Sequence, residues 1–201
     1  MYLGAMSPSP ELFQPETADR TAPASRAEPL PTSPEALLAR LAGLGIAATT
    51  HRHPPVHTVE ESKALRGDLP GAHCKTLLLK DRKGGLWLVV AQEDRRLDLA
   101  RLHRRLGSGR LSFAGADTLW RVLGVRPGSV TPFALINDRE CRVNVALDAG
   151  MMACDPLNYH PLENDRTTAL RPGDLLTFIA ACGHTPRVIA LDGDDPADVL
   201  P

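Results

Sequence analysis

Apolar residues recur at helical spacing in several segments of this chain. The first stripe consists of Leu37, Leu38, Leu41 and Leu44. Ser33 and Pro34 stand just ahead of it, as a favoured N-cap and a favoured first helical residue, so the pattern predicts a helix that begins at residue 34. Further helices are predicted for residues 59–65, where Thr58 and Glu61 form a capping box, and for residues 98–106, 117–123 and 172–181.

Short apolar runs predict strands between these helices. The runs at 77–79 and 86–91 flank a turn at 81–85 and are expected to form a hairpin. Other strands are predicted for residues 46–52, 111–113, 133–136, 143–147, 151–154 and 188–191. Residues 155–168 show little periodicity and are interpreted as a functional loop. Interspersed helices and strands with a hairpin indicate an α/β (α+β-like) domain on a mixed sheet.

Composition divides the chain into one domain and two tails. The chain has 201 residues, of which 43% are hydrophobic. Residues 1–32 are rich in Pro, Ala, Ser, Thr and Glu, so a disordered N-terminal tail is expected there. Residues 33–192 form the domain, and residues 193–201 an acidic C-terminal tail. No apolar run reaches membrane-spanning length, so no membrane association is expected.

Charge and cysteine content narrow the partners and the compartment. The net charge of −1 argues against general coating of nucleic acid, DNA included, but permits binding to one end of one nucleic acid. The four cysteines are widely spaced without a CxxC pair. They are interpreted as reduced thiols in a cytoplasmic protein, and no metal or other cofactor is expected.

Lys75 is the first candidate site residue. It stands two residues before the apolar run at 77–79, where an ammonium is costly to bury unless an anion meets it. His73 and Thr76 are polar neighbours on the same strand. An edge lysine that extends to water is the competing interpretation, at even odds. Cys74 should face the opposite side of the strand and pack in the core.

Two further segments carry candidate chemistry. The loop from Gly128 to Pro132 can present backbone amides to a carbonyl or an oxyanion, although most such loops are only turns. His160 precedes a proline, which holds it extended, so it could orient a substrate or act as acid or base. The other histidines are interpreted as structural, with His57 as the first exception to consider. There is no nucleophile elbow, Walker loop, dinucleotide fingerprint or HExxH motif.

Several segments together resemble one known family. They are residues 53–61 (HPPVHTVEE), 73–81 (HCKTLLLKD), 128–138 (GSVTPFALIND), 159–162 (YHPL) and 167–170 (TTAL), followed by a helix and Gly183-His184. Their order and combination resemble the freestanding prolyl-tRNA editing proteins of the YbaK/ProX superfamily, above all the alanyl-tRNA(Pro) deacylases. The resemblance covers roughly residues 33–192.

The resemblance implies a curved mixed sheet flanked by helices, and a hydrolase that cleaves a wrong amino acid from tRNA(Pro). It implies that Lys75 holds the phosphate of the terminal adenosine and that His160 helps hold the ribose or the aminoacyl group. The attacking water would be activated largely by the substrate's own ribose hydroxyl, without a metal. The loop from Gly128 to Pro132 would fix the substrate carbonyl through backbone amides, which makes Gly128 a catalytic residue together with Lys75 and His160. Further residues expected to bind substrate are Thr76, His57, Ser129, Val130, Thr131 and Pro132.

Thr76 departs from the family pattern, which commonly has Asn after the lysine. This leaves the amino acid open: alanine is favoured, and serine, threonine, cysteine or a small non-protein amino acid are alternatives. A different class of function is a noncatalytic module that binds tRNA or a synthetase. The expected partner is the acceptor end of tRNA(Pro), with prolyl-tRNA synthetase or an elongation factor as further candidates.

Residues 95–110 contain six arginines. Among them Arg101, Arg104 and Arg105 lie on the polar face of the predicted helix at 98–106. They are expected either to contact the tRNA backbone or to form an ordinary solvated face, with equal weight.

Overall fold

The computed structural model describes residues 28–54 and 69–191. Within these ranges eight strands form one sheet in the order β1-β7-β6-β2-β3-β5-β8, and β4 pairs with β2 beside this path. The strands are β1 (Thr49–Arg52), β2 (Ala72–Asp81), β3 (Leu86–Gln92), β4 (Leu111–Phe113), β5 (Val143–Asp148), β6 (Leu157–Tyr159), β7 (Arg166–Leu170) and β8 (Arg187–Ile189). The helices are α1 (Pro34–Gly43), α3 (Leu99–Leu106), α4 (Ala116–Leu123), the 3-10 helix η1 (Pro132–Asn137), α5 (Ala149–Met152) and α6 (Pro172–Ala181).

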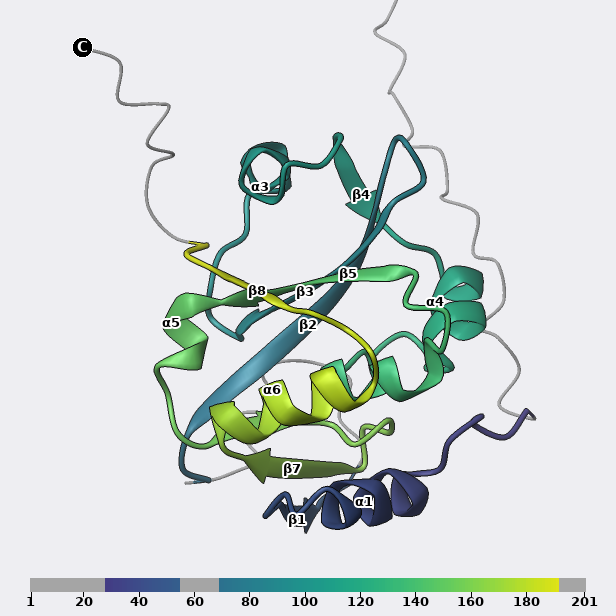
Figure 1. The fold of residues 1–201 in the computed structure, drawn as a ribbon, viewed down its shortest axis with the longest axis vertical. Coiled ribbons are helices and arrows are strands. Elements are labelled where there is room, and N and C mark those ends of the chain that lie inside the picture. The colour runs from purple at the N-terminus through teal and green to yellow at the C-terminus, as the bar shows by residue number, and fades with distance from the viewer. Residues whose placement is uncertain (1–27, 55–68, 192–201) are drawn as a thin grey trace, which may run out of the picture.

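Strand β2 joins the two halves of the sheet, and Figure 1 shows it as the long band through the molecule. Along most of its length it pairs antiparallel with β3, from Cys74 opposite Gln92 to Lys80 opposite Leu86. At its start it runs parallel to β6, and its end pairs antiparallel with β4. The predicted mixed sheet and its hairpin are therefore confirmed.

The two faces of β2 and β3 contribute to different cores, because side chains alternate along a strand. On one face, Leu78, Leu88 and Val90 belong to the main core together with side chains of α1, α4, η1 and α6. On the other face, Leu79 and Val89 pack with α3 in a smaller core. Figure 1 shows α6 across the near face of the sheet and α3 beside β4 at the top.

Local chemistry explains where several helices begin. The Ser33 hydroxyl accepts a hydrogen bond from the amide of Ala36 and caps α1, and the Asp98 carboxylate caps α3 in the same way. Helix α6 begins with Pro172, whose missing N–H would have no partner in the first turn. The structure confirms the helix predicted to begin at residue 34 and the helices predicted for residues 98–106, 117–123 and 172–181. Their ends agree with the predicted ends within a residue or two.

Three predicted segments are wrong. Residues 133–136 form η1 rather than a strand, because Thr131 caps the segment and Pro132 starts it. Residues 151–154 are not a strand: Asp148 caps the short helix α5, which ends at Met152. Residues 155–168 are not one loop, since they contain β6 and the start of β7. These two strands are too short for a visible alternation pattern.

The structure also describes a short segment ahead of the predicted domain. Residues 28–32, assigned above to the tail, contact the domain: Leu30 packs against the main core, and the Thr32 hydroxyl donates to Asn137 at 2.7 Å. The predicted helix at 59–65 and the candidate His57 lie outside the described residues. In the described parts of the chain, no helix has the length and apolar character that crossing a membrane requires.

Candidate functional site

Lys75 is half-buried in the middle of β2, opposite Ala91. Its ammonium donates a hydrogen bond to the backbone carbonyl of Arg95. Burial lowers the pKa of Lys75, while the nearby carboxylates of Asp94 and Glu93 act in the opposite direction. The side chain is thus a partly desolvated cation that a neutral carbonyl holds, and an anionic ligand can compete for it.

Arg95 fixes the carbonyl that Lys75 contacts. The Arg95 guanidinium pairs with the fully buried carboxylate of Asp148, with 3.2 Å between Nε and Oδ2. Asp148 also accepts a hydrogen bond from the amide of Gly150 and so caps α5. An ion pair therefore ties the segment after β3 to the end of β5. Sequence reasoning noted Arg95 only as one of six arginines, because no local pattern links it to Asp148.

The neighbours of Lys75 lie on opposite faces of β2. His73 shares the face of Lys75, and Cys74 and Thr76 face the main core. Burial raises the pKa of the Cys74 thiol to about 12, which is typical of an inert core cysteine. The expectation that Cys74 packs in the core is confirmed. Thr76 is itself buried, with 9% of its surface exposed.

His160 follows β6 and is held by a backbone contact. Its Nδ1 lies 3.0 Å from the carbonyl oxygen of Arg166. Because a carbonyl only accepts, Nδ1 carries the proton and Nε2 is the accepting nitrogen of the neutral ring. Burial lowers the pKa of His160, so the ring is neutral at pH 7. A neutral ring with this tautomer can accept a hydrogen bond from a substrate hydroxyl.

His53, the residue after β1, lies beside His160. The two rings meet edge to face with 6.1 Å between their centres. The Nδ1 of His53 lies 2.8 Å from the Pro54 carbonyl, so its Nε2 accepts from the Thr167 hydroxyl at 3.0 Å. His53 was interpreted above as a structural histidine. Nothing in the sequence indicated that its ring would lie beside that of His160.

A small cavity lies beside His160. Its volume is about 40 Å³, and its walls come from β2, β6 and β7 and from Glu93 just after β3. The lining residues are His73, Cys74, Glu93, Asn158, Tyr159, His160 and Thr167. Lys75 is not among them, but it is two residues from His73 on the same face of β2. The cavity is therefore polar, small and next to the strand that carries the lysine.

The loop from Gly128 to Pro132 connects α4 to η1. Gly128 is exposed and has a φ of +88°, and a Cβ added to it would meet no atom within 4 Å. A ligand can therefore approach its backbone closely. The Ser129 amide closes a turn onto the Arg126 carbonyl at 3.0 Å. Val130 packs against the main core, and Thr131 and Pro132 are buried at the start of η1.

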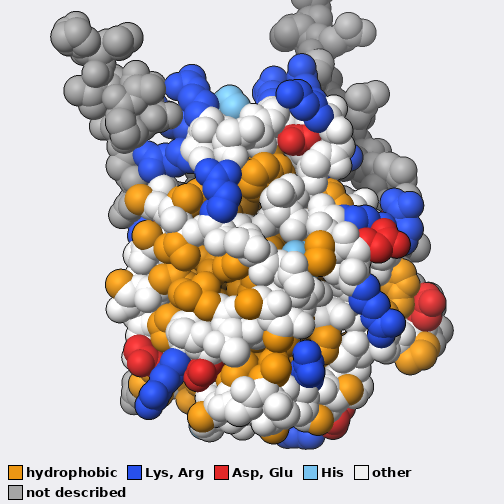
Figure 2. All heavy atoms as spheres, in the orientation of Figure 1, with side chains coloured by type: hydrophobic (Ala, Val, Ile, Leu, Met, Phe, Trp, Pro, Cys, Tyr) orange, Lys and Arg blue, Asp and Glu red, His pale blue; other side chains and the backbone are white. Residues whose placement is uncertain are grey.

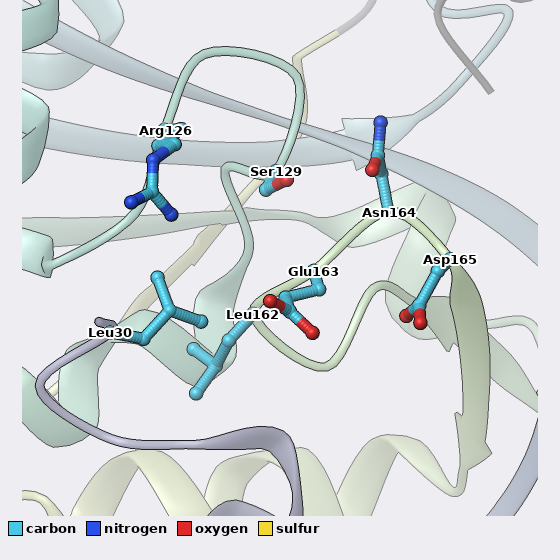
Figure 3. A pocket seen from close by; sticks show the side chains of 7 residues that line it. All are labelled: Leu30, Arg126, Ser129, Leu162, Glu163, Asn164 and Asp165. Atoms are coloured by element: carbon cyan, nitrogen blue, oxygen red, sulfur yellow. The ribbon is translucent and has the colours of Figure 1, made fainter. Parts of the chain in front are cut away.

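This loop faces the segment that follows His160. Both line a second cavity of about 310 Å³, to which the loop contributes Ser129 and the other segment contributes residues 162–165 (Figure 3). Arg166 anchors that segment: its guanidinium, 8% exposed, pairs with Asp165 at 2.7 Å and with Glu35 of α1 at 2.9 Å. These contacts with Arg166 lower the pKa values of both carboxyls.

The predicted arginines lie on α3, away from both cavities. Arg105 donates to the carbonyl of Ala190 at 2.7 Å, and Arg101 pairs with Asp98 at 3.6 Å. Figure 2 shows basic side chains gathered at the top of the molecule, where α3 lies in Figure 1. Among the residues that the structure describes, no group of three His, Cys, Asp or Glu side chains could hold a metal ion.

Comparison with known proteins gives consistent results. Residues 53–178 match the family of aminoacyl-tRNA editing domains. A bovine protein named prolyl-tRNA synthetase associated domain-containing protein 1 is 40% identical over 162 residues, which is 78% of this chain and 94% of that protein. The prolyl-tRNA editing protein ProX of Acetoanaerobium sticklandii is 35% identical over 158 residues, covering 78% of this chain and 96% of that one.

A solved structure shares the fold. It is described as a candidate trans-editing enzyme for prolyl tRNA synthetase and superposes with a TM-score of 0.62 at 20% identity. The match covers 80% of this chain and 97% of the other. At this identity the similarity concerns the arrangement of the sheet and helices alone.

Proposed function

Because this chain belongs to the family of aminoacyl-tRNA editing domains, we propose that it hydrolyses the ester bond of mischarged tRNA(Pro), with Ala-tRNA(Pro) as its preferred substrate. The observation that carries the proposal is the partly desolvated Lys75, which lies two residues along β2 from His73 in the wall of the cavity of His160. The relative named prolyl-tRNA editing protein ProX, at 35% identity, supports the reaction class.

Each proposed role is assigned to a group whose surroundings in the absence of substrate are described above. The Lys75 ammonium exchanges the Arg95 carbonyl for the phosphate of the terminal nucleotide, a charge-assisted contact. The backbone at Gly128, which a ligand can approach closely, polarises the ester carbonyl. The accepting Nε2 of His160 orients a ribose hydroxyl, and that hydroxyl helps activate the attacking water. Catalysis then rests on positioning and carbonyl polarisation.

The size of the cavity beside His160 supports a small amino acid. A volume of about 40 Å³ suits a methyl side chain and is short for a pyrrolidine ring. A correctly charged Pro-tRNA(Pro) would then be rejected by sterics. Thr76 faces the main core beside this strand, so a change of residue at that position alters the volume behind the cavity rather than its charge.

A panel of charged tRNAs tests the substrate. We expect the protein to deacylate Ala-tRNA(Pro) rapidly and to leave Pro-tRNA(Pro) intact, with Ser-, Thr- and Cys-tRNA(Pro) hydrolysed slowly. Rapid loss of another member would keep the reaction and change the amino acid. No hydrolysis of any member, with tRNA still bound, would favour a noncatalytic module.

A further inference from the structure

Glu93 is an acidic residue in the wall of the small cavity of about 40 Å³ described above. It directly follows β3, and its amide donates a hydrogen bond to the His73 carbonyl at 2.8 Å. The register of β2 and β3 pairs Cys74 with Gln92, so Glu93 stands opposite His73. Residues that stand opposite each other in an antiparallel pair point to the same face. The Glu93 side chain therefore lies on the face that also carries Lys75.

The Glu93 carboxylate is close enough to act on both side chains of the proposed site. Burial is the main influence on the pKa values of Lys75 and His160 and lowers both, while Glu93 opposes this lowering at each of them. Among the described residues that line this cavity, Glu93 is the one with a carboxylate. It is half-buried, so its charge is screened less than that of a fully exposed acid.

Three hydrogen-bond donors of the cavity wall are directed at the protein itself. The Asn158 amide nitrogen donates to a backbone carbonyl at 3.0 Å. The Tyr159 hydroxyl donates to the Met151 sulfur at 3.3 Å. The Thr167 hydroxyl donates to His53, as described above. A ligand group that binds against this wall should therefore bring donors of its own.

The acceptors of this wall suit a small cation. They are the Glu93 carboxylate and the Nε2 of His160, and the second is assigned to the ribose hydroxyl. The α-ammonium of an aminoacyl ester has three donors and no acceptor. It also adds a second cation to a partly desolvated site that already contains Lys75, which is costly unless a carboxylate balances it. Glu93 is in the position to provide this balance.

We propose that the Glu93 carboxylate binds the α-ammonium of the aminoacyl ester, so that the protein selects esters with a free, charged amine. This inference rests on the proposed function and names the class of ester that the site accepts. The methyl group of alanine lies in the cavity, and the ammonium on the same carbon meets Glu93 in its wall. An N-acylated end, such as that of a peptidyl-tRNA, has no charge at this nitrogen and is rejected.

The test compares Ala-tRNA(Pro) with lactyl-tRNA(Pro), in which a neutral hydroxyl replaces the α-amine. The measurement is made at about pH 7, where an α-amine is charged. Glu93→Gln retains the size of the side chain and removes its charge. We expect this variant to lower kcat/KM for Ala-tRNA(Pro) by about 10- to 100-fold, and to change kcat/KM for lactyl-tRNA(Pro) by less than about twofold.

Asp94→Asn is the matched control. Asp94 is the next residue, is exposed and does not line the cavity. Like Glu93, it opposes the effect of burial on the pKa of Lys75. An effect that passes through Lys75 changes both esters alike, because both carry the same terminal nucleotide. Asp94→Asn should therefore keep the wild-type ratio of the two kcat/KM values.

Unchanged rates in Glu93→Gln, or equal losses for the two esters, would overturn the proposal. The wild-type protein supplies a second measurement, for the case that the variant does not fold. Its acceleration over spontaneous hydrolysis should be about tenfold or more greater for Ala-tRNA(Pro) than for lactyl-tRNA(Pro). Equal accelerations would overturn the role of Glu93 and leave the proposed function intact. If neither ester is hydrolysed, the proposed function itself fails.

Discussion

Burial determines the charge state of the side chains on which the proposed site depends. The pKa values of Lys75 and His160 are both lowered by burial. For Lys75, the nearby carboxylates of Asp94 and Glu93 oppose this lowering of the pKa. For His160 the ordinary value of 6.5 is close to neutrality, so the same direction of shift makes the folded ring neutral.

The pH dependence of stability tests the state of His160. Its pKa is lower in the folded than in the unfolded protein, so the unfolded chain binds more protons as the pH falls. The neutral ring therefore contributes stability above pH 6.5. This contribution is lost as the pH falls from 6.5 toward the pKa that His160 has in the folded protein. In chemical denaturation between about pH 7.5 and 5.5, His160→Gln should lose less stability than the wild-type protein.

His51 supplies the control for this comparison, since it lies exposed on β1. His51→Gln should retain the pH dependence of the wild-type protein. If His160→Gln and His51→Gln follow the same pH dependence, the ring of His160 is not held neutral by the fold.

Gly128 can be tested against a glycine with the same backbone strain. Gly128 and Gly84 have φ values of +88° and +86°, and a Cβ at either would meet no atom within 4 Å. Gly128→Ala and Gly84→Ala should each lower the free energy of unfolding by about 1–2 kcal/mol. Only Gly128→Ala should also slow deacylation, measured under conditions where both variants are folded. Equal rates for the two would remove the loop from the proposed mechanism.

At the scale of elements, sequence patterns predicted those whose signals are local. Helices α1 and α3 carry side-chain caps, α6 begins with a proline, and all three have buried leucines. The β2–β3 hairpin has two apolar runs and a polar turn. The pattern failed at η1, where a continuous apolar run fits a buried strand as well as a buried helix. It failed again at β6 and β7, which contain three and five residues and pair with the distant strands β2 and β1.

The packing of η1 yields a stability prediction. Phe133 is fully buried and meets Tyr159 and Phe178 edge to face, with ring centres 5.8 and 5.4 Å apart. Phe133→Ala should therefore lower the free energy of unfolding by about 3–5 kcal/mol. Phe113→Ala on β4 is the matched control, since Phe113 is 61% exposed, and it should change stability by less than about 0.5 kcal/mol. A small effect at Phe133 in urea titration would contradict the position of η1.

At the candidate site, too, sequence patterns reveal local features but not the contacts between distant segments. Three features of the site stand out in the sequence. They are Lys75 just before an apolar run, Gly128 in a short loop that ends with a proline, and His160 directly before a proline. The partners that hold them do not stand out, since Arg95 reaches Asp148 and His53 reaches His160 only through the fold. The cavity at Ser129 and Arg126 combines segments that are more than thirty residues apart, so no motif could reveal it.

On the scale of the whole molecule, charge is distributed unevenly although the net charge is only −1. Basic side chains gather at the end of the molecule that holds α3 (Figure 2), while the proposed site lies around β2, β6 and the loop at Gly128. A tRNA has a long charged backbone beyond its 3′ end. We therefore propose that α3 contacts the backbone, which adds affinity without selecting the amino acid.

Charge reversal tests this proposal. The double variant Arg101→Glu with Arg104→Glu should weaken tRNA binding and reduce the salt dependence of the affinity by about one unit of slope per lost contact. Its amino-acid preference should not change. The control reverses Arg40 and Arg139, which are exposed and lie outside α3, and thus alters the net charge equally. Equal affinities for the two double variants would show that α3 is an ordinary solvated face.

The central claim is that Lys75 makes this chain a deacylase of Ala-tRNA(Pro). The most direct measurement is the half-life of Ala-tRNA(Pro) with the wild-type protein, with Lys75→Ala and with Lys80→Ala, which removes an exposed lysine of the same strand. We expect rapid deacylation by the wild-type protein and by Lys80→Ala, and a rate near that of spontaneous hydrolysis for Lys75→Ala. An unchanged half-life with the wild-type protein, or full activity in Lys75→Ala, would contradict the account.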